Sequence, residues 1–337
     1  MNNTTIVVGA GFNFDSGAEV GPIYAESLNG PFKFVCRYPL MKELVPLCFP
    51  ERQNEVCQSI EEWFQQSIES GNMKPLRHLY DELMKADYYL VPRLVDPDRG
   101  IDSPYSRFFN HFLQADFITF NYDSFVEISL HRLGRWTPVD GYGVSVLVCT
   151  STAVSEKVSI PEYSQNLVLH IHGSLCVYES DFTFSEADRA GIHWLKQKPE
   201  TEFLFDPDSL SHLFFPWERV IQPFLGLDPL ETRVVAPVPQ KAKGLKAVFV
   251  NKVRERAADV IRNADRVVAV GYSFNPVDCE SYEFILQELS GKHNSVLFIV
   301  APSAADIAIR LRTSFSRIDF KPIEMRFSEW ASNGFKL

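Results

Sequence analysis

The sequence predicts an α/β protein with a doubly wound, mainly parallel sheet that carries a helical insertion. Three observations lead to this prediction. Short β-rich runs recur along the chain and end at glycine or polar residues, segments of helical periodicity lie between them, and the composition allows a large core. The chain has 337 residues, of which 45% are hydrophobic and 13% aromatic. Strands that alternate with helices are typical of parallel sheets covered by helices.

The first part of the chain contains one strand followed by a long helical region. The β-rich run 4–8 predicts the first strand. Segments 55–70 and 76–90 carry apolar residues at helical spacing, and segment 103–113 begins with serine and proline, a favourable helix start. We therefore interpret residues 22–115 as a helical insertion that packs on the sheet.

Strands and helices alternate again after this insertion. The predicted strands are 116–120, 166–173, 233–239, 266–271 and 295–302. The predicted helices are 123–133, 246–263, 279–289 and 303–315. Residues 190–232 are rich in proline and aromatic residues and give no clear pattern. The alternation predicts a Rossmann-like sheet in a single domain, residues 1–337.

Composition excludes several classes of protein. The net charge of -10 disfavours direct binding to nucleic acid or to anionic membranes. No apolar run is long enough to cross a membrane, and no signal peptide is recognised. The six cysteines are scattered and form no Cys-x-x-Cys pair, which indicates a reducing cytoplasm and predicts no zinc site.

A glycine turn follows the first strand and indicates nucleotide binding. Gly9 and Gly11 allow a tight turn whose backbone N–H groups face a diphosphate, and Asn13 is a candidate ribose contact. Phe14 occupies the position where the dehydrogenase fingerprint requires a third glycine, and no Gly-Lys-Ser or Gly-Lys-Thr is present. The alternative is a purely structural strand-to-helix turn.

Polar residues also follow the next predicted strand. Asn121 and Asp123 come directly after the run 116–120. Ligands of parallel α/β sheets bind beyond the carboxyl ends of the strands, which makes both residues candidates for a site. The alternative is that Asn121 is a turn residue and Asp123 a helix cap.

Two further strand ends carry candidate residues. His170 and His172 are expected on one face of a strand, where either is a candidate metal ligand or general base, or a structural histidine. Gly271 permits close approach of a ligand and Ser273 is a candidate ribose contact, although an ordinary turn explains both.

Four segments, taken in this order, resemble the sirtuin family. They are GAGFNFDSG (9–17), TFNYD (119–123), LHIHGS (169–174) and GYSFNPVD (271–278). The sequence is most similar to the sirtuin-like NAD hydrolases of bacterial antiviral defence, in which Asn-Tyr-Asp and His-Gly-Ser are typical. The resemblance extends over most of the chain through short motifs.

The resemblance implies a role for each matching residue in handling NAD. Asn121 would orient the attacking water beside the nicotinamide ribose, Asp123 would shape the nicotinamide pocket, and His172 would act as general base. The residues implied in binding are Gly9, Ala10, Gly11 and Asn13 at the diphosphate and ribose, and Gly271, Tyr272 and Ser273 at the adenosine side.

Two departures separate the chain from the protein-deacylating sirtuins. Those enzymes carry two Cys-x-x-Cys pairs that bind zinc, and none exists here. They have glutamine before the asparagine, where this chain has Phe120. Both departures disfavour a deacylase. Asn13 also stands where many sirtuins have serine.

The resulting expectation is an NAD+ hydrolase that releases nicotinamide and ADP-ribose and acts as an effector in antiphage defence. NAD would be its substrate, with no zinc required. A non-enzymatic nucleotide-binding sensor or scaffold subunit is the alternative. Because uncontrolled NAD hydrolysis would harm the host, we expect control by homo-oligomerisation or by a partner protein, of the ATPase or Argonaute type that the resemblance suggests.

Overall fold

A computed structural model describes about two thirds of the chain. The described residues are 3–14, 23–24, 33–34, 45, 48–52, 54, 57–80, 83, 104–151, 162–179, 192–196, 203–205 and 248–337. The predicted strand 233–239 and much of the predicted insertion 22–115 therefore lie outside the described residues. The division into a single domain with an insertion stays a prediction.

The central element is a six-stranded parallel sheet. Its strands lie in the order β12 (Asp319–Ile323), β11 (Val296–Val300), β10 (Arg266–Val270), β1 (Thr4–Val8), β4 (Asp116–Thr119) and β6 (Val168–His170). In chain order this is 3-2-1-4-5-6, the doubly wound, Rossmann-like arrangement, so the predicted fold class is confirmed. The direction of winding reverses between β1 and β10, and ligands of such sheets bind beside this switch point.

Burial explains why the inner strands read as apolar runs. Every residue of β1 is buried, and so are the last four residues of β10. A parallel sheet is covered on both faces, so its inner strands need apolar side chains on both. The edge strand β12 is different, because three of its five residues are exposed and it contains Pro322.

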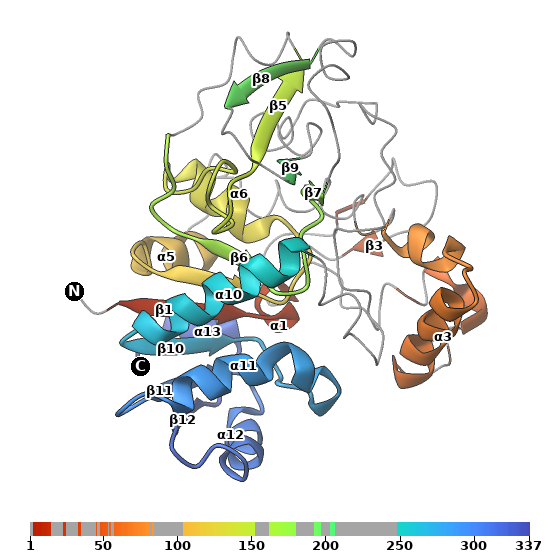
Figure 1. Ribbon diagram of the computed structural model, residues 1–337. Coiled ribbons are helices and arrows are strands. Elements are labelled where there is room, and N and C mark those ends of the chain that lie inside the picture. The colour runs from red at the N-terminus through yellow and green to blue at the C-terminus, as the bar shows by residue number, and fades with distance from the viewer. Residues whose placement is uncertain are drawn as a thin grey trace.

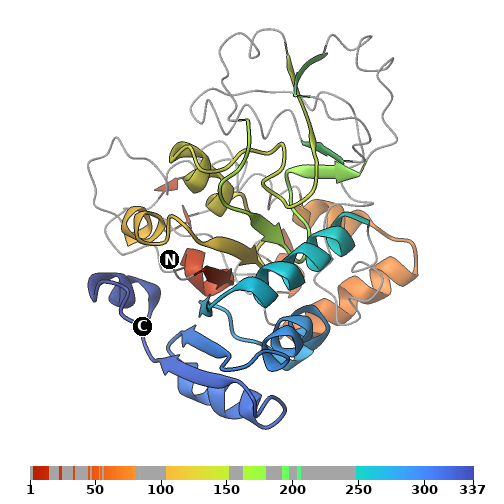
Figure 2. The same ribbon diagram turned by 60° about the vertical axis from the view of Figure 1, so that its left-hand side comes forward.

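Helices cover both faces of the sheet, as Figures 1 and 2 show. In the order of the chain, the helices of the structure include α1 (Ala10–Phe14), α3 (Cys57–Glu69), α5 (Pro104–His111), α6 (Phe125–Arg132), α10 (Val248–Asn263), α11 (Cys279–Ser290), α12 (Ala304–Arg312) and α13 (Phe327–Ser332), with short 3-10 turns η1 (Pro50–Arg52) and η4 (Pro276–Asp278). Helix α3 lies beside the sheet in Figure 1 and does not cover a face of it. Helices α10 and α11 pack together on one face, and α5 packs with α13 on the other.

An aromatic cluster anchors the glycine turn in the core. Phe12, in α1, is fully buried. Its ring contacts five others, those of Tyr105, Phe108, Phe109, Phe125 and Phe327, at centroid distances of 4.7 to 6.2 Å. The Tyr105 hydroxyl also donates a hydrogen bond to the Phe12 carbonyl oxygen, at 2.6 Å. The turn is therefore held by α5, α6 and α13 together.

Two smaller sheets complete the described fold. One has four strands in the order β7 (Val177–Glu179), β9 (Phe203–Phe205), β5 (Leu147–Ser151) and β8 (Ile192–Lys196), and the other pairs β2 (Ile23–Tyr24) with β3 (Lys33–Phe34). The four-stranded sheet lies beyond β6, at the end of the central sheet opposite β12 (Figure 1).

Most predicted elements match the structure, and a few were missed. The helices predicted at 55–70, 103–113, 123–133, 246–263, 279–289 and 303–315 correspond to α3, α5, α6, α10, α11 and α12. The predicted strand 166–173 is shorter in the structure and ends at His170. No helix among the described residues is long and apolar enough to cross a membrane.

Candidate functional site

The glycine turn and the end of β10 meet at the switch point of the sheet. The Gly11 N–H donates to the Gly271 carbonyl at 2.9 Å, and the Gly9 N–H donates to Val270 at 3.1 Å. Gly271 has a φ of 63°, and a Cβ there would lie 2.1 Å from the Phe12 nitrogen. The glycines thus allow two backbones to come close together, which supports the structural interpretation of this turn alongside the ligand-binding one.

Asn121 links the end of β4 to the glycine turn. Its side-chain nitrogen donates to the Gly9 carbonyl at 3.3 Å, and its backbone N–H donates to the Thr119 hydroxyl at 3.0 Å. Asn121 is half-buried. Its side-chain oxygen Oδ1 receives no hydrogen bond from the part of the chain that the structure describes, so this acceptor is available to a ligand or water.

His172 lies in the turn after β6 and faces α11. Its Nε2 lies 2.9 Å from the hydroxyl of Ser281, and both residues are buried. The expectation that His170 and His172 share one face is wrong. Strand β6 ends at His170, so the alternation of side chains stops there and the two imidazoles face different helices.

An aromatic pair joins these turns. The rings of Tyr272 and Phe120 stack at a centroid distance of 4.0 Å, and Phe120 contacts the His172 ring edge-on at 5.3 Å. A Cβ on Gly9 would lie 2.7 Å from the Tyr272 ring. Contacts therefore run without a break from the glycine turn through Tyr272 and Phe120 to His172, and the four predicted segments converge.

The remaining predicted binding residues differ in exposure. Ala10 and Ser273 are exposed, and the Ser273 carbonyl accepts a hydrogen bond from Arg310 at 2.7 Å. Asn13 is only 1% exposed, and its side chain interacts with the Asp123 carboxyl, whose pKa it lowers, although neither of its polar atoms meets strict hydrogen-bond geometry. Asn13 therefore has a buried partner, and its role as a ribose contact stays a prediction.

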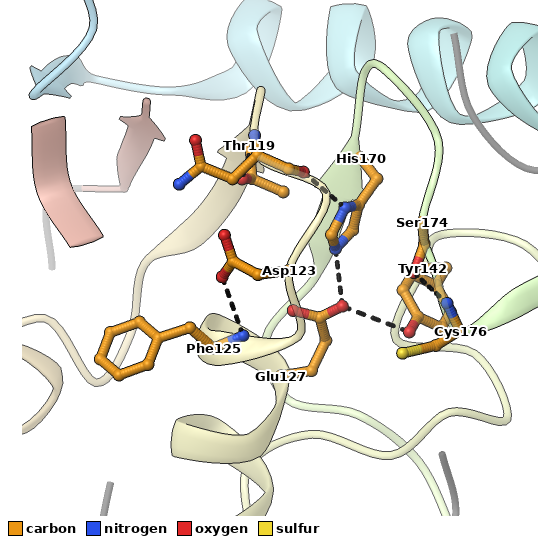
Figure 3. A network of polar contacts seen from close by, with 9 residues as sticks. Thr119, Asp123, Phe125, Glu127, Tyr142, His170, Ser174 and Cys176 are labelled. Carbon is orange, nitrogen blue, oxygen red and sulfur yellow. Dashed lines mark hydrogen bonds and ion pairs between the residues drawn. The ribbon is translucent and has the colours of Figure 1, made fainter. Parts of the chain in front are cut away.

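A network of buried polar groups connects to the backbone of Asn121, and Figure 3 shows its members His170, Glu127 and Tyr142. His170 is fully buried, and its Nε2 lies 2.6 Å from Oε1 of Glu127, which is 1% exposed. The Nδ1 of the same ring lies 3.1 Å from the Asn121 carbonyl oxygen. The Tyr142 hydroxyl donates to the same Glu127 oxygen at 3.3 Å. Burial by itself lowers the pKa of an imidazole, but the Glu127 carboxylate outweighs it and the pKa of His170 is raised.

Asp123 is buried beside this network. Burial, and next the negative charge of Glu127, raise the pKa of Asp123 to about 6. The Phe125 N–H donates to Asp123 Oδ1 at 3.1 Å and opposes this rise. The N-cap of α6 is Ser124, so Asp123 is not the cap itself, but its carboxylate accepts from the N–H of the first helical residue, Phe125. With this raised pKa, the carboxyl is about half protonated near pH 6 and mostly ionised at pH 7.

A cavity opens on the other side of the glycine turn, next to the ends of β10, β11 and β12. Its volume is about 180 Å³. The residues that line it are Gly11, Gly271, Val300, Ala301, Pro302, Met325, Arg326 and Phe327. The lining is mostly apolar, with one cationic residue. Complete ligand pockets usually measure about 300–1,000 Å³, so this space fits one part of a larger ligand.

Sequence reasoning missed Glu127, Tyr142 and Ser281. A signal existed for Glu127, because it lies four residues after Asp123 on a helix whose neighbouring residues are apolar, which places a charge on the buried face. Ser281 and Tyr142 gave no signal, because their roles depend on contacts with distant segments. Among the described residues, no group of three or more His, Cys, Asp or Glu side chains could hold a metal ion.

Comparisons with known proteins find a distant structural similarity to Sir2 enzymes over nearly the whole chain. One similar structure is a serine-to-alanine mutant of a Sir2 homologue in complex with ADP-ribose, with 13% identity, coverage of 98% of this chain and 90% of that chain, and a TM-score of 0.40. Another is a Sir2 homologue in complex with NAD, with 13% identity, coverage of 98% and 87%, and a TM-score of 0.36. No family model and no curated protein matches the sequence.

Proposed function

We propose that this protein is an NAD+ hydrolase, which cleaves the nicotinamide–ribose bond to give nicotinamide and ADP-ribose. The observation that carries the proposal is the meeting of four strand-end turns at the switch point, linked by the Asn121–Gly9 hydrogen bond and the Tyr272–Phe120 stack. Nucleotides bind to doubly wound sheets at this place. The resemblance of the same four turns to sirtuin motifs names NAD as the nucleotide.

The adjacent cavity suits the adenosine end of such a ligand. Its apolar walls, Val300, Ala301 and Phe327 among them, would contact a planar base. Gly11 and Gly271 would let the ligand approach the backbone closely, and the guanidinium of Arg326 would attract a phosphate. The nicotinamide end would then lie on the side of Asn121 and Asp123.

The chemistry requires a water on the correct face of the ribose and stabilisation of a positive charge. Glycosidic bonds break through an oxocarbenium-like state, and nicotinamide departs without a charge. The Asn121 oxygen would hold the water and face the cation, and the Asp123 carboxylate would add negative charge nearby. His172 would accept a proton from water or a ribose hydroxyl, and the hydroxyl of Ser281 would hold its ring in place.

Nicotinamide release from NAD tests the proposal directly. The purified chain is incubated with NAD, and nicotinamide and ADP-ribose are quantified by chromatography at several protein concentrations. Equimolar release of the two products is expected. Tight binding of intact NAD without any release would instead support the alternative function, a non-enzymatic nucleotide sensor or scaffold subunit.

Control of this activity by assembly is part of the proposal. Tyr272 is only 6% exposed, and its stack on Phe120 fills the space between Gly9 and His172. A substrate that reaches both residues must displace this pair. Homo-oligomerisation or a partner protein of the ATPase or Argonaute type would displace the Tyr272–Phe120 pair. Such control would keep an effector of antiphage defence inactive until it is needed. Full activity of the isolated monomer would contradict this part.

A further inference from the structure

The ion pair of His170 and Glu127 is buried, unlike an ordinary surface salt bridge. Both side chains are almost completely removed from solvent, at 0% and 1% exposure. Burying two charges costs free energy that their attraction barely recovers, so such a pair is weak evidence for stability. A role in arranging other groups explains the pair better, and its contacts show which groups these are.

The hydrogen bonds determine where the protons are. A carbonyl oxygen only accepts, so Nδ1 of His170 must donate to the Asn121 carbonyl. The Glu127 oxygen accepts from the Tyr142 hydroxyl and faces Nε2 of the same imidazole. Glu127 also raises the pKa of His170, which favours a proton on Nε2 in addition to the one on Nδ1. Both ring nitrogens of His170 then carry protons, and the ring is an imidazolium.

The groups that face His170 come from three segments. Glu127 lies on α6, Asp123 lies in the turn before α6, and Tyr142 lies in the segment before β5 (Figure 3). Ser174 and Cys176, after β6, lie against Tyr142 rather than against the imidazole. The imidazolium therefore faces two carboxyl groups, one paired with it and one close to the candidate site.

Asn121 is held at three points as a result. Its N–H donates to the Thr119 hydroxyl, its side-chain nitrogen donates to Gly9, and its carbonyl accepts from His170. Only the third of these bonds comes from a charged donor, which makes it the strongest type. The bond to His170 thus fixes the peptide that carries the Asn121 side chain.

We propose that His170 and Glu127 are positioning residues: the buried imidazolium–carboxylate pair orients Asn121 through its carbonyl oxygen. The kinetic part of this inference rests on the proposed NAD hydrolysis. Glu127 pairs with one ring nitrogen of His170, and the other ring nitrogen donates to the Asn121 carbonyl. Neither residue needs to touch the substrate.

Two substitutions of His170 separate its two bonds. The side-chain nitrogen of asparagine occupies the place of Nδ1, and that of glutamine occupies the place of Nε2. His170→Asn keeps the donor to Asn121, and His170→Gln keeps the donor to Glu127. We expect kcat for nicotinamide release to fall about 10- to 100-fold more in His170→Gln than in His170→Asn, while ADP-ribose affinity changes little in either.

A purely structural role predicts a different pattern. Both variants would then lose activity only in proportion to the fraction unfolded, and kcat per folded molecule would equal that of the wild type. Equal kcat values in the two variants, or a parallel loss of ADP-ribose binding, would overturn the positioning role.

Magnetic resonance tests the pair without any activity. With 15N-labelled histidine, wild-type His170 is expected to show two protonated ring nitrogens at pH 7. In Glu127→Gln the ring is expected to keep only the proton on Nδ1 at pH 7, because the carboxylate partner of Nε2 is gone. A neutral His170 ring in the wild type at pH 7, or an imidazolium that persists in Glu127→Gln, would refute the inference even if NAD is hydrolysed. Absence of NAD binding and hydrolysis in the wild type would refute the proposed function alone.

Discussion

The two halves of the central sheet present different chemistry on either side of the switch point. Beyond β4 and β6, buried polar groups are dense, with His170, Glu127 and Asp123 all within one network. Beyond β10 to β12, the surface is an apolar cavity lined by residues such as Val300 and Phe327. Under the proposed function, the polar side would carry out the chemistry and the apolar side would bind the ligand.

Among the substitutions considered, a change at the glycine contact between the two halves should reduce the free energy of unfolding most. Gly271→Ala combines a positive φ with a Cβ 2.1 Å from the Phe12 nitrogen. We expect a loss of about 4 kcal/mol or more in the free energy of unfolding. Gly134 has a similar φ of 67° but open space around its Cβ position, so Gly134→Ala should cost only about 1–2 kcal/mol. If denaturant titrations give equal losses of unfolding free energy for Gly271→Ala and Gly134→Ala, the two halves are not packed closely at Gly271.

The polar half should give the protein a pH-dependent stability. The pKa of Asp123 is raised to about 6 in the folded state, from an ordinary value of 3.8. The folded state therefore binds more protons, and the free energy of unfolding should fall by about 3 kcal/mol as pH rises from about 4 to above 6. Deprotonation of His170, whose pKa is also raised, adds a further fall at higher pH.

Asp123→Asn should abolish the decrease in the free energy of unfolding between about pH 4 and pH 6. The matched control is Asp306→Asn on α12, which replaces an exposed carboxyl and should follow the wild-type curve. Chemical denaturation at a series of pH values measures the difference. A wild-type curve in the Asp123 variant would mean that this carboxyl is not held protonated.

Loss of the candidate catalytic groups should affect turnover and spare binding. Asn121→Ala and His172→Ala are expected to lower kcat for nicotinamide release about 100-fold or more, because each removes a positioned group from the reaction. ADP-ribose binding, measured by calorimetry, should persist because the cavity lies on the other side. Asn110→Ala and His293→Ala, which change residues away from the site, serve as controls. If Asn121→Ala and His172→Ala release nicotinamide at the wild-type rate, the active site does not lie in the polar half.

The apolar half should show the opposite pattern. Ala301→Leu would fill part of the 180 Å³ cavity and is expected to weaken ADP-ribose binding about tenfold, with kcat at saturating NAD little changed. The control Ala305→Leu lies on α12, and Ala305 does not line the cavity. If Ala301→Leu lowers kcat and leaves ADP-ribose binding unchanged, the cavity takes part in the chemistry and not in ligand binding.

Sequence reasoning succeeded where local patterns decide the outcome. The strands β1 and β10 are apolar on both faces, and helices such as α5 and α11 carry a regular apolar face, so both were predicted. Strand β12 was missed because an exposed edge strand with Pro322 has no apolar pattern. Helix α13 was missed because it is only six residues long.

The candidate site was predictable only in part. Polar residues after the strands marked Asn121 and Asp123, because parallel strands bring their carboxyl ends to one edge. The partners of these residues were not predictable. Ser281 is 109 residues from His172 along the chain, and nothing in either segment indicates that contact.

The sequence alone determined the alternation of strands and helices, the glycine turn and the candidate residues, because these depend on local periodicity and backbone freedom. The tertiary structure decided which polar groups share a proton and where space remains. It turned His170 toward Glu127 and His172 toward Ser281, although the two histidines are only two residues apart. Burial and distance set these charges and contacts, and both are properties of the folded chain.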